Sequence, residues 1–192
     1  LVTPAKNLTL TLGASGDLFE ESGEFYSDFR IPGFPPDQPI PVEPPPVLGE
    51  KNQFNPKAGL SWNLASGTTL RGAWFKTLKR TLVTDQTLEP TQVSGFNQFF
   101  DDPSATQSEV WGVALDQKFG RKVFGGVEYS ERDLTIPQLL LEDGVTWTLS
   151  EKPGEERQAR AYLFGAVHPW VALGAEYQYE KFDLDPELFF SF

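Results

Sequence analysis

The sequence contains no cysteine and only one histidine, His168. Without cysteine there are no disulfides, no thiolate metal sites and no cysteine nucleophile. A lone histidine has no second imidazole with which to build a histidine-based metal site. We therefore expect neither a metal ion nor another cofactor.

A basic segment is also missing. The 192 residues carry 16 Lys and Arg against 27 Asp and Glu, which gives a formal net charge of −11. Proteins that bind nucleic acid neutralise its phosphates with clustered Lys and Arg. The composition therefore argues against a nucleic-acid partner.

No apolar run is long enough for a membrane-spanning helix. The longest uncharged apolar stretch covers residues 161–175, and a spanning helix needs about 20 residues. His168-Pro169 lies in the middle of this stretch, where proline would break a helix. We interpret the stretch as two strands joined by a tight turn.

Apolar and polar residues alternate with a period of two in most of the chain. Aromatic residues make up 14% of the sequence, which is typical of abundant β-structure. The alternating segments cover residues 8–15, 56–64, 68–78, 108–119, 123–132, the two stretches that flank His168-Pro169, and 186–192. This pattern predicts an all-β fold of antiparallel neighbours, with no helix longer than about two turns. The complete segments have about nine to twelve residues, the length of a tilted membrane-spanning strand.

Short and long connections alternate between these segments. The short ones are residues 65–67, Gly120-Arg121 and His168-Pro169. The others need about twenty residues or more, a length that is uncommon in a compact soluble domain. Outer-membrane barrels have short periplasmic turns and long extracellular loops. We therefore predict an up-and-down outer-membrane β-barrel of about seven or eight strands. It forms a single domain over residues 1–192, with a long proline-rich extracellular loop at residues 20–52.

The proline-rich loop contains four aromatic residues near its start. Eight of the fifteen residues at 32–46 are proline, so this part cannot pair regularly in a sheet. The aromatic residues are Phe25, Tyr26, Phe29 and Phe34. They are candidates for contact with a ligand, and packing onto neighbouring loops is the alternative.

The two faces of the predicted strands differ in chemistry. Apolar positions include Leu8, Leu60, Trp62, Leu115, Val127, Leu173 and Tyr177, and we expect this row to contact lipid. The opposite row carries Lys57, Arg71, Asp116, Lys118, Glu128, Arg132, Arg160, Glu176 and Glu180, which we expect to line a lumen. A solvated sheet face is the alternative. Trp62, Trp74, Trp111 and Trp170, near strand ends, favour interfacial anchoring.

Several strand motifs resemble a known family. They are NPKAGLSW (residues 55–62), TTLRGAWFKTLKR (68–80), LEPTQVSGFNQFFDD (88–102), VALDQKF (113–119) and GGVEYSERDLTIP (125–137). Together they resemble the barrel of TonB-dependent-receptor-like outer-membrane proteins, especially barrels attached to tetratricopeptide-repeat segments. The resemblance implies a large barrel, a plug domain in the true receptors, and energised uptake of nutrients. Such transporters have about 22 strands, so we expect these residues to be a segment of a larger barrel, and a small closed barrel is the alternative.

The functional expectation is a transport or export channel in a bacterial outer membrane. Its expected partners are outer-membrane lipid and the remaining barrel strands or a tetratricopeptide-repeat region of the same protein. A soluble, secreted β-sandwich that binds ligand through its long aromatic loops is the alternative. An enzyme that uses His168 as a general base is the weakest reading, because a histidine before proline in a turn usually has a structural role. We expect no enzymatic activity.

Overall fold

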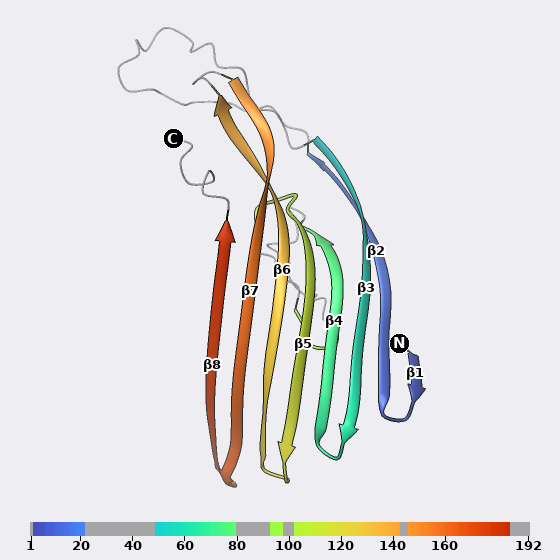
Figure 1. The fold of residues 1–192 in the computed structure, drawn as a ribbon, viewed down its shortest axis with the longest axis vertical. Helices are drawn as coiled ribbons and strands as arrows, with labels where there is room; N and C mark the ends of the chain where they lie inside the picture. Colours follow the sequence, from blue (N-terminus) through green and yellow to red (C-terminus); the bar gives the residue numbers. More distant parts are fainter. Residues whose placement is uncertain (1, 22–48, 80–92, 98–101, 143–145, 185–192) are drawn as a thin grey trace, which may run out of the picture.

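The computed structural model describes residues 2–21, 49–79, 93–97, 102–142 and 146–184. Its strands are β1 (Val2–Ala5), β2 (Leu8–Glu21), β3 (Gly49–Ala65), β4 (Thr68–Leu78), β5 (Gln107–Phe119), β6 (Val123–Glu142), β7 (Thr146–His168) and β8 (Val171–Leu184). They form one antiparallel sheet in chain order, with β1 and β8 at its two edges (Figure 1). The described residues include no helix, and hence none long and apolar enough to cross a membrane. The all-β, up-and-down antiparallel class is confirmed.

The short turns lie together at one end of the sheet (Figure 1). They join β1 to β2, β3 to β4, β5 to β6 and β7 to β8. Gly67 and Gly120 have φ of 88° and 71° in two of these turns, a conformation that glycine adopts without strain. Because neighbouring strands are antiparallel, β2, β4 and β6 end at the opposite end of the sheet.

The long connection expected between the segment at residues 123–132 and the segment before His168 is wrong. β6 continues to Glu142, β7 begins at Thr146, and β6 pairs with β7 along its whole length. Pro137 and Pro153 explain the error, because proline interrupts a strand pattern. Pro137 lies beyond Thr135, the last β6 residue that pairs with β5. Pro153 lies beyond Gly154, where the described pairing of β7 with β8 ends. Among the described residues, both prolines thus occur where the strand has only one neighbour.

Other strand bounds also differ from the sequence pattern. β2 and β3 pair as far as Glu21 and Gly49, well beyond the predicted segments. The short strand β1 was not predicted. β4 has the predicted bounds, Thr68–Leu78. The strand expected at residues 186–192 lies outside the described residues.

The pairing register aligns residues of like chemistry across the sheet. One continuous row consists of Leu8, Trp62, Leu70, Leu115, Val127, Ala161 and Tyr177. The adjacent row, on the opposite side, consists of Thr9, Ser61, Arg71, Ala114, Glu128, Arg160 and Gln178. We call the two sides the apolar face and the polar face. Leu60 and Leu173 also lie on the apolar face, so the expected row is reproduced as one face.

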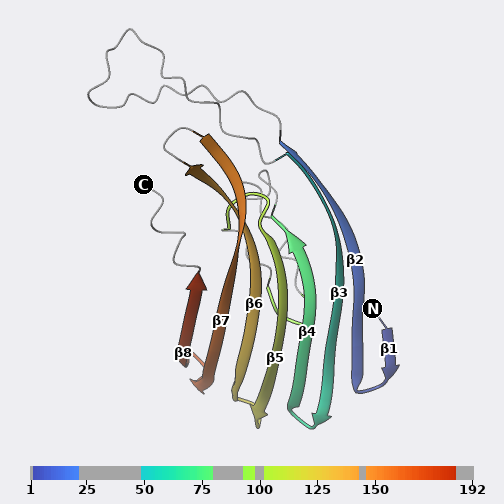
Figure 2. The same cartoon turned by 45° about the horizontal axis from the view of Figure 1, so that its top comes forward.

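The small buried core lies on the polar face. Phe75, Val110 and Ala114 of the sheet pack there with Val93 and Phe96 from the β4–β5 connection. On the apolar face, by contrast, Val127, Leu173 and Tyr177 are 55%, 61% and 68% exposed. The sheet is a curved layer (Figure 2). Lys51 Nζ of β3 lies 2.6 Å from Glu151 Oε1 of β7, although three strands lie between β3 and β7 in the sheet. The β2–β3 and β6–β7 hairpins therefore approach each other.

The position of the core predicts unequal effects of truncation on the two faces. Phe75 is 1% exposed, so Phe75→Ala should lower the free energy of unfolding by about 3–5 kcal/mol. The control Leu115→Ala, at a position that is 41% exposed, should cost much less. Urea unfolding in detergent micelles, followed by tryptophan fluorescence, measures both. Equal losses would contradict a core on the polar face.

Candidate functional site: the polar face

All the predicted lumen residues lie on the polar face. They are Lys57 of β3, Arg71 of β4, Asp116 and Lys118 of β5, Glu128 and Arg132 of β6, Arg160 of β7, and Glu176 and Glu180 of β8. The period of two places them there, because alternate residues of a strand point to opposite sides. The predicted loop contacts Phe25, Tyr26, Phe29 and Phe34 lie outside the described residues.

Arg71 is the centre of the first ion-pair cluster. Its Nε donates to Asp116 Oδ2 at 2.6 Å and its Nη2 donates to Glu128 Oε2 at 3.1 Å. Its Nη1 donates to the carbonyl oxygen of Ser94 at 3.0 Å. Tyr162 Oη donates to Asp116 Oδ1 at 2.5 Å. One guanidinium therefore links β4, β5 and β6 to the β4–β5 connection.

Arg132 is the centre of a second, more buried cluster. Its Nη1 and Nη2 donate to the two carboxylate oxygens of Asp102 at 2.7 and 3.1 Å. Its Nε and Nη2 donate to Glu156 Oε2 at 2.8 and 2.5 Å. The side chains of Arg132 and Asp102 are only 10% and 12% exposed. The strand pattern predicted that Arg132 lies on this face. It did not predict Asp102, because this residue belongs to the β4–β5 connection and not to a strand.

The third group lies at the β8 edge and is more open to solvent. Arg160 Nε donates to Glu176 Oε1 at 2.8 Å, with both side chains more than a third exposed. The amides of Gln158 and Gln178 both donate to Glu180 Oε1. This edge therefore combines one ion pair with two carboxamide groups.

A tight turn of the β4–β5 connection packs onto the polar face. Val93 and Phe96 each donate a backbone N–H to the other's carbonyl oxygen at 3.0 Å. Ser94 and Gly95 between them have φ of 51° and 90°, as a type I′ turn requires. We call these residues the 93–96 turn. Sequence reasoning missed it, although Ser-Gly between two apolar residues is a turn signal.

Two glycines of the sheet make room for the 93–96 turn. A Cβ added at Gly59 of β3 would come within 2.8 Å of Val93 Cγ1. A Cβ added at Gly112 of β5 would lie 2.4 Å from the ring of Phe96. Side chains at these positions would exclude the turn from its present place. Both glycines belong to the polar face, where the ladder joins Gly59 to Ala73 and Ala73 to Gly112.

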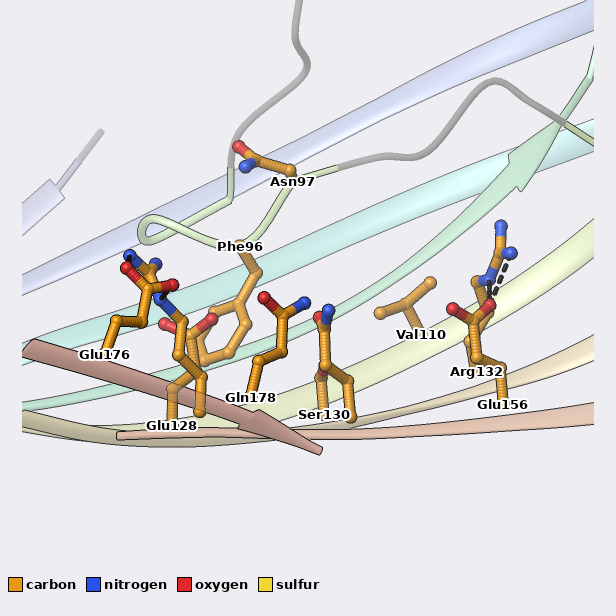
Figure 3. A pocket seen from close by; sticks show the side chains of 11 residues that line it. Phe96, Asn97, Val110, Glu128, Ser130, Arg132, Glu156, Glu176 and Gln178 are labelled. Carbon is orange, nitrogen blue, oxygen red and sulfur yellow. Dashed lines mark hydrogen bonds and ion pairs between the residues drawn. The ribbon is translucent and has the colours of Figure 1, made fainter. Parts of the chain in front are cut away.

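Beside the turn lies a polar recess of about 200 Å³ (Figure 3). Phe96 points into it from the connection, and Glu128, Ser130 and Gln178 rise from the sheet below. Each of the charged side chains in its lining has an oppositely charged partner. The pairs are Glu128 with Arg71, Arg132 with Glu156 and Asp102, and Arg160 with Glu176. Two arginines and three glutamates line the recess, so it offers hydrogen-bond donors and acceptors together with an excess of negative charge.

His168 lies away from these clusters, at the tight-turn end between β7 and β8. Its ring contacts Trp170, with 4.7 Å between ring centroids. Within the part of the chain that the structure describes, no three potential ligands from His, Cys, Asp and Glu gather as a metal site.

No protein-family model matches the chain, and no similar protein is found among the curated proteins or the solved structures.

The ion pairs of Arg132 and Arg160 should differ in the stability that is lost when the arginine is removed. Arg132→Met leaves two carboxylates unpaired in a buried place and should lower the free energy of unfolding by about 3–5 kcal/mol. The control Arg160→Met breaks an exposed pair and should cost no more than about 1 kcal/mol. Urea titrations of both variants in micelles provide the comparison. A neutral Arg132→Met variant would show that this cluster does not stabilise the fold.

Proposed function

We propose that these residues form part of an outer-membrane β-barrel whose polar face lines a passage for solute. The observation that carries this proposal is the continuous apolar face, which is exposed and aligned row by row across the sheet. Barrels in a membrane turn alternate residues outward to lipid and inward to a polar interior.

The apolar face is too exposed for an ordinary soluble surface. Val113, Leu115, Val127 and Leu163 are neighbours on it, and each is at least 41% exposed. No second sheet covers it among the described residues. Soluble monomers rarely expose apolar patches larger than a few hundred Å². Lipid tails are an occupant that matches such a surface in extent and chemistry.

Aromatic side chains mark one border of the apolar face. Trp74 and Trp111 pair across β4 and β5. The next pair on the same face, toward the end of β4, is Lys76 with Glu109. Trp74 Nε1 donates to Glu109 Oε1 at 2.7 Å. A tryptophan with its ring beside apolar residues and its N–H on a charged group is typical of a membrane–water interface.

Tyr129 repeats this arrangement on the neighbouring strand. Its ring lies 5.4 Å from that of Trp111, and its hydroxyl donates to Glu131 Oε2 at 3.0 Å. From Trp111 to Phe119 the apolar row of β5 extends about 27 Å along the strand, at about 3.4 Å per residue. Strands of known barrels are tilted by about 35–45°, so this length corresponds to a height of about 19–22 Å, near their apolar band of about 25 Å. The face therefore has a comparable height as well as a suitable border.

The two edges of the sheet determine what else the barrel needs. β1 and β8 are not hydrogen-bonded to each other in the described sheet. Within the described sheet, the outer edge of β8, over Val171–Leu184, has no neighbouring strand, and unpaired backbone groups are costly in lipid. Our proposal therefore includes further strands beyond this sheet, as in the larger barrels of TonB-dependent-receptor-like proteins.

Charge substitutions on the apolar face should show a dependence on depth. Leu115 lies near the middle of the apolar row, so Leu115→Arg should cost about 2–4 kcal/mol in a bilayer. Leu173 lies close to the tight-turn end of β8, so Leu173→Arg should cost only about 0–1 kcal/mol. Unfolding from phosphatidylcholine vesicles measures both values. Two small and equal costs would mean that this face does not contact lipid.

Association of the purified chain with lipid tests the proposal as a whole. We expect it to float with phosphatidylcholine vesicles in a density gradient and to aggregate when detergent is removed without lipid. The Leu115→Arg variant should float less, while Ser130→Arg, on the polar face, should float like the parent chain. A chain that stays monodisperse without detergent or lipid would favour a soluble ligand-binding protein instead.

A further inference from the structure

We propose that the 93–96 turn is a fixed constriction of the passage, held by Arg71, which admits small uncharged polar solutes. This inference rests on the proposed function, because it assigns a part of the same polar face a role in selectivity.

The turn lies deep along the sheet and not at its end. The connection that contains it leaves β4 at Leu78, yet the turn contacts Arg71, near the start of that strand. Seven residues of extended strand separate these positions, or about 24 Å at about 3.4 Å per residue. The turn therefore lies on the polar face at the level of Arg71 and not at the end of β4. A segment placed this way would reduce the cross-section of a passage bounded by that face.

Contacts with three strands fix the turn. Arg71 of β4 donates to the carbonyl oxygen of Ser94, and its guanidinium lies 5.4 Å from the centre of the Phe96 ring. Val93 and Phe96 are 2% and 3% exposed, against Gly59 of β3 and Gly112 of β5. Such burial favours one stable position of the turn, since displacing it would expose both apolar side chains.

The charges around the turn disfavour anions. Arg71 already binds Asp116 and Glu128, and Arg160 binds Glu176. An anion that enters the recess must compete with these carboxylates for the arginines, and it meets their excess negative charge. A hydroxyl-rich neutral solute can instead exchange hydrogen bonds with Ser130, Gln158 and Gln178, which line the same recess.

The position of the turn can be tested by thiol accessibility, because the chain has no cysteine. Val93 is 2% exposed on the polar face, so Val93→Cys should react slowly with a small maleimide in the folded protein and quickly after unfolding in urea. The control Trp170→Cys, in the turn between β7 and β8 at a position that is 80% exposed, should react quickly in both states. Equally fast reaction of the two cysteines in the folded protein would overturn the fixed turn.

Solute entry into vesicles tests the constriction. The chain together with the remaining barrel strands of its protein, in phosphatidylcholine vesicles, should admit small uncharged saccharides faster than sugar acids of equal size. Gly112→Ala places a Cβ against Phe96 and should raise the size limit to larger saccharides. Gly72→Ala is the matched control, because its Cβ meets only an ordinary contact at 3.8 Å. If Gly112→Ala does not fold, Phe96→Ala removes the ring without a clash and should also raise the limit.

The outcomes separate this inference from the proposed function. A raised size limit in Gly112→Ala or Phe96→Ala, with Gly72→Ala unchanged, supports the constriction. Entry in all variants with the same size and charge dependence would overturn the constriction and leave a passage. No entry through inserted parent chain would overturn the passage, and the constriction with it.

Discussion

The structure depends above all on the register of its antiparallel ladders. Each strand alternates apolar and polar residues, but alternation alone would not make a surface. The register places Leu8, Trp62 and Leu70 in one row and continues that row to Tyr177 at the other edge. A shift of one residue in any ladder would turn the side chains of that strand to the wrong face. The apolar and polar faces are thus collective properties of the pairing.

The polar face is stabilised by a different means. Arg71 of β4 pairs with Glu128, two strands away on β6, and Arg132 of β6 pairs with Asp102 of the β4–β5 connection. These ion pairs tie separate segments together across the face, and Val93 and Phe96 of the 93–96 turn add an apolar cluster with residues of the sheet. Buried cations and carboxylates need such partners, because an unpaired buried charge is costly. The same contacts that stabilise the face also shape the recess.

Much of the fold was predictable from local pattern. The strand Thr68–Leu78, the tight turns and the side of every proposed lumen residue follow from the period of two and from Gly and Pro positions. The β6–β7 hairpin was not predictable in this way, because Pro137 and Pro153 disrupt its pattern and only the ends of β5 and β8 explain why they are tolerated. The 93–96 turn and Asp102 were missed because their roles come from contacts distant in sequence.

The most direct test of the central claim is a nitroxide scan along β6 in lipid vesicles. Single cysteines at residues 123, 124 and 127–130 can each carry a spin label, since the chain has no other thiol. If one face contacts lipid and the other a polar passage, collision with oxygen should peak at Val123, Val127 and Tyr129. Collision with a water-soluble nickel chelate should peak at the alternate positions. High exposure of the odd-numbered positions to the nickel chelate would contradict the account.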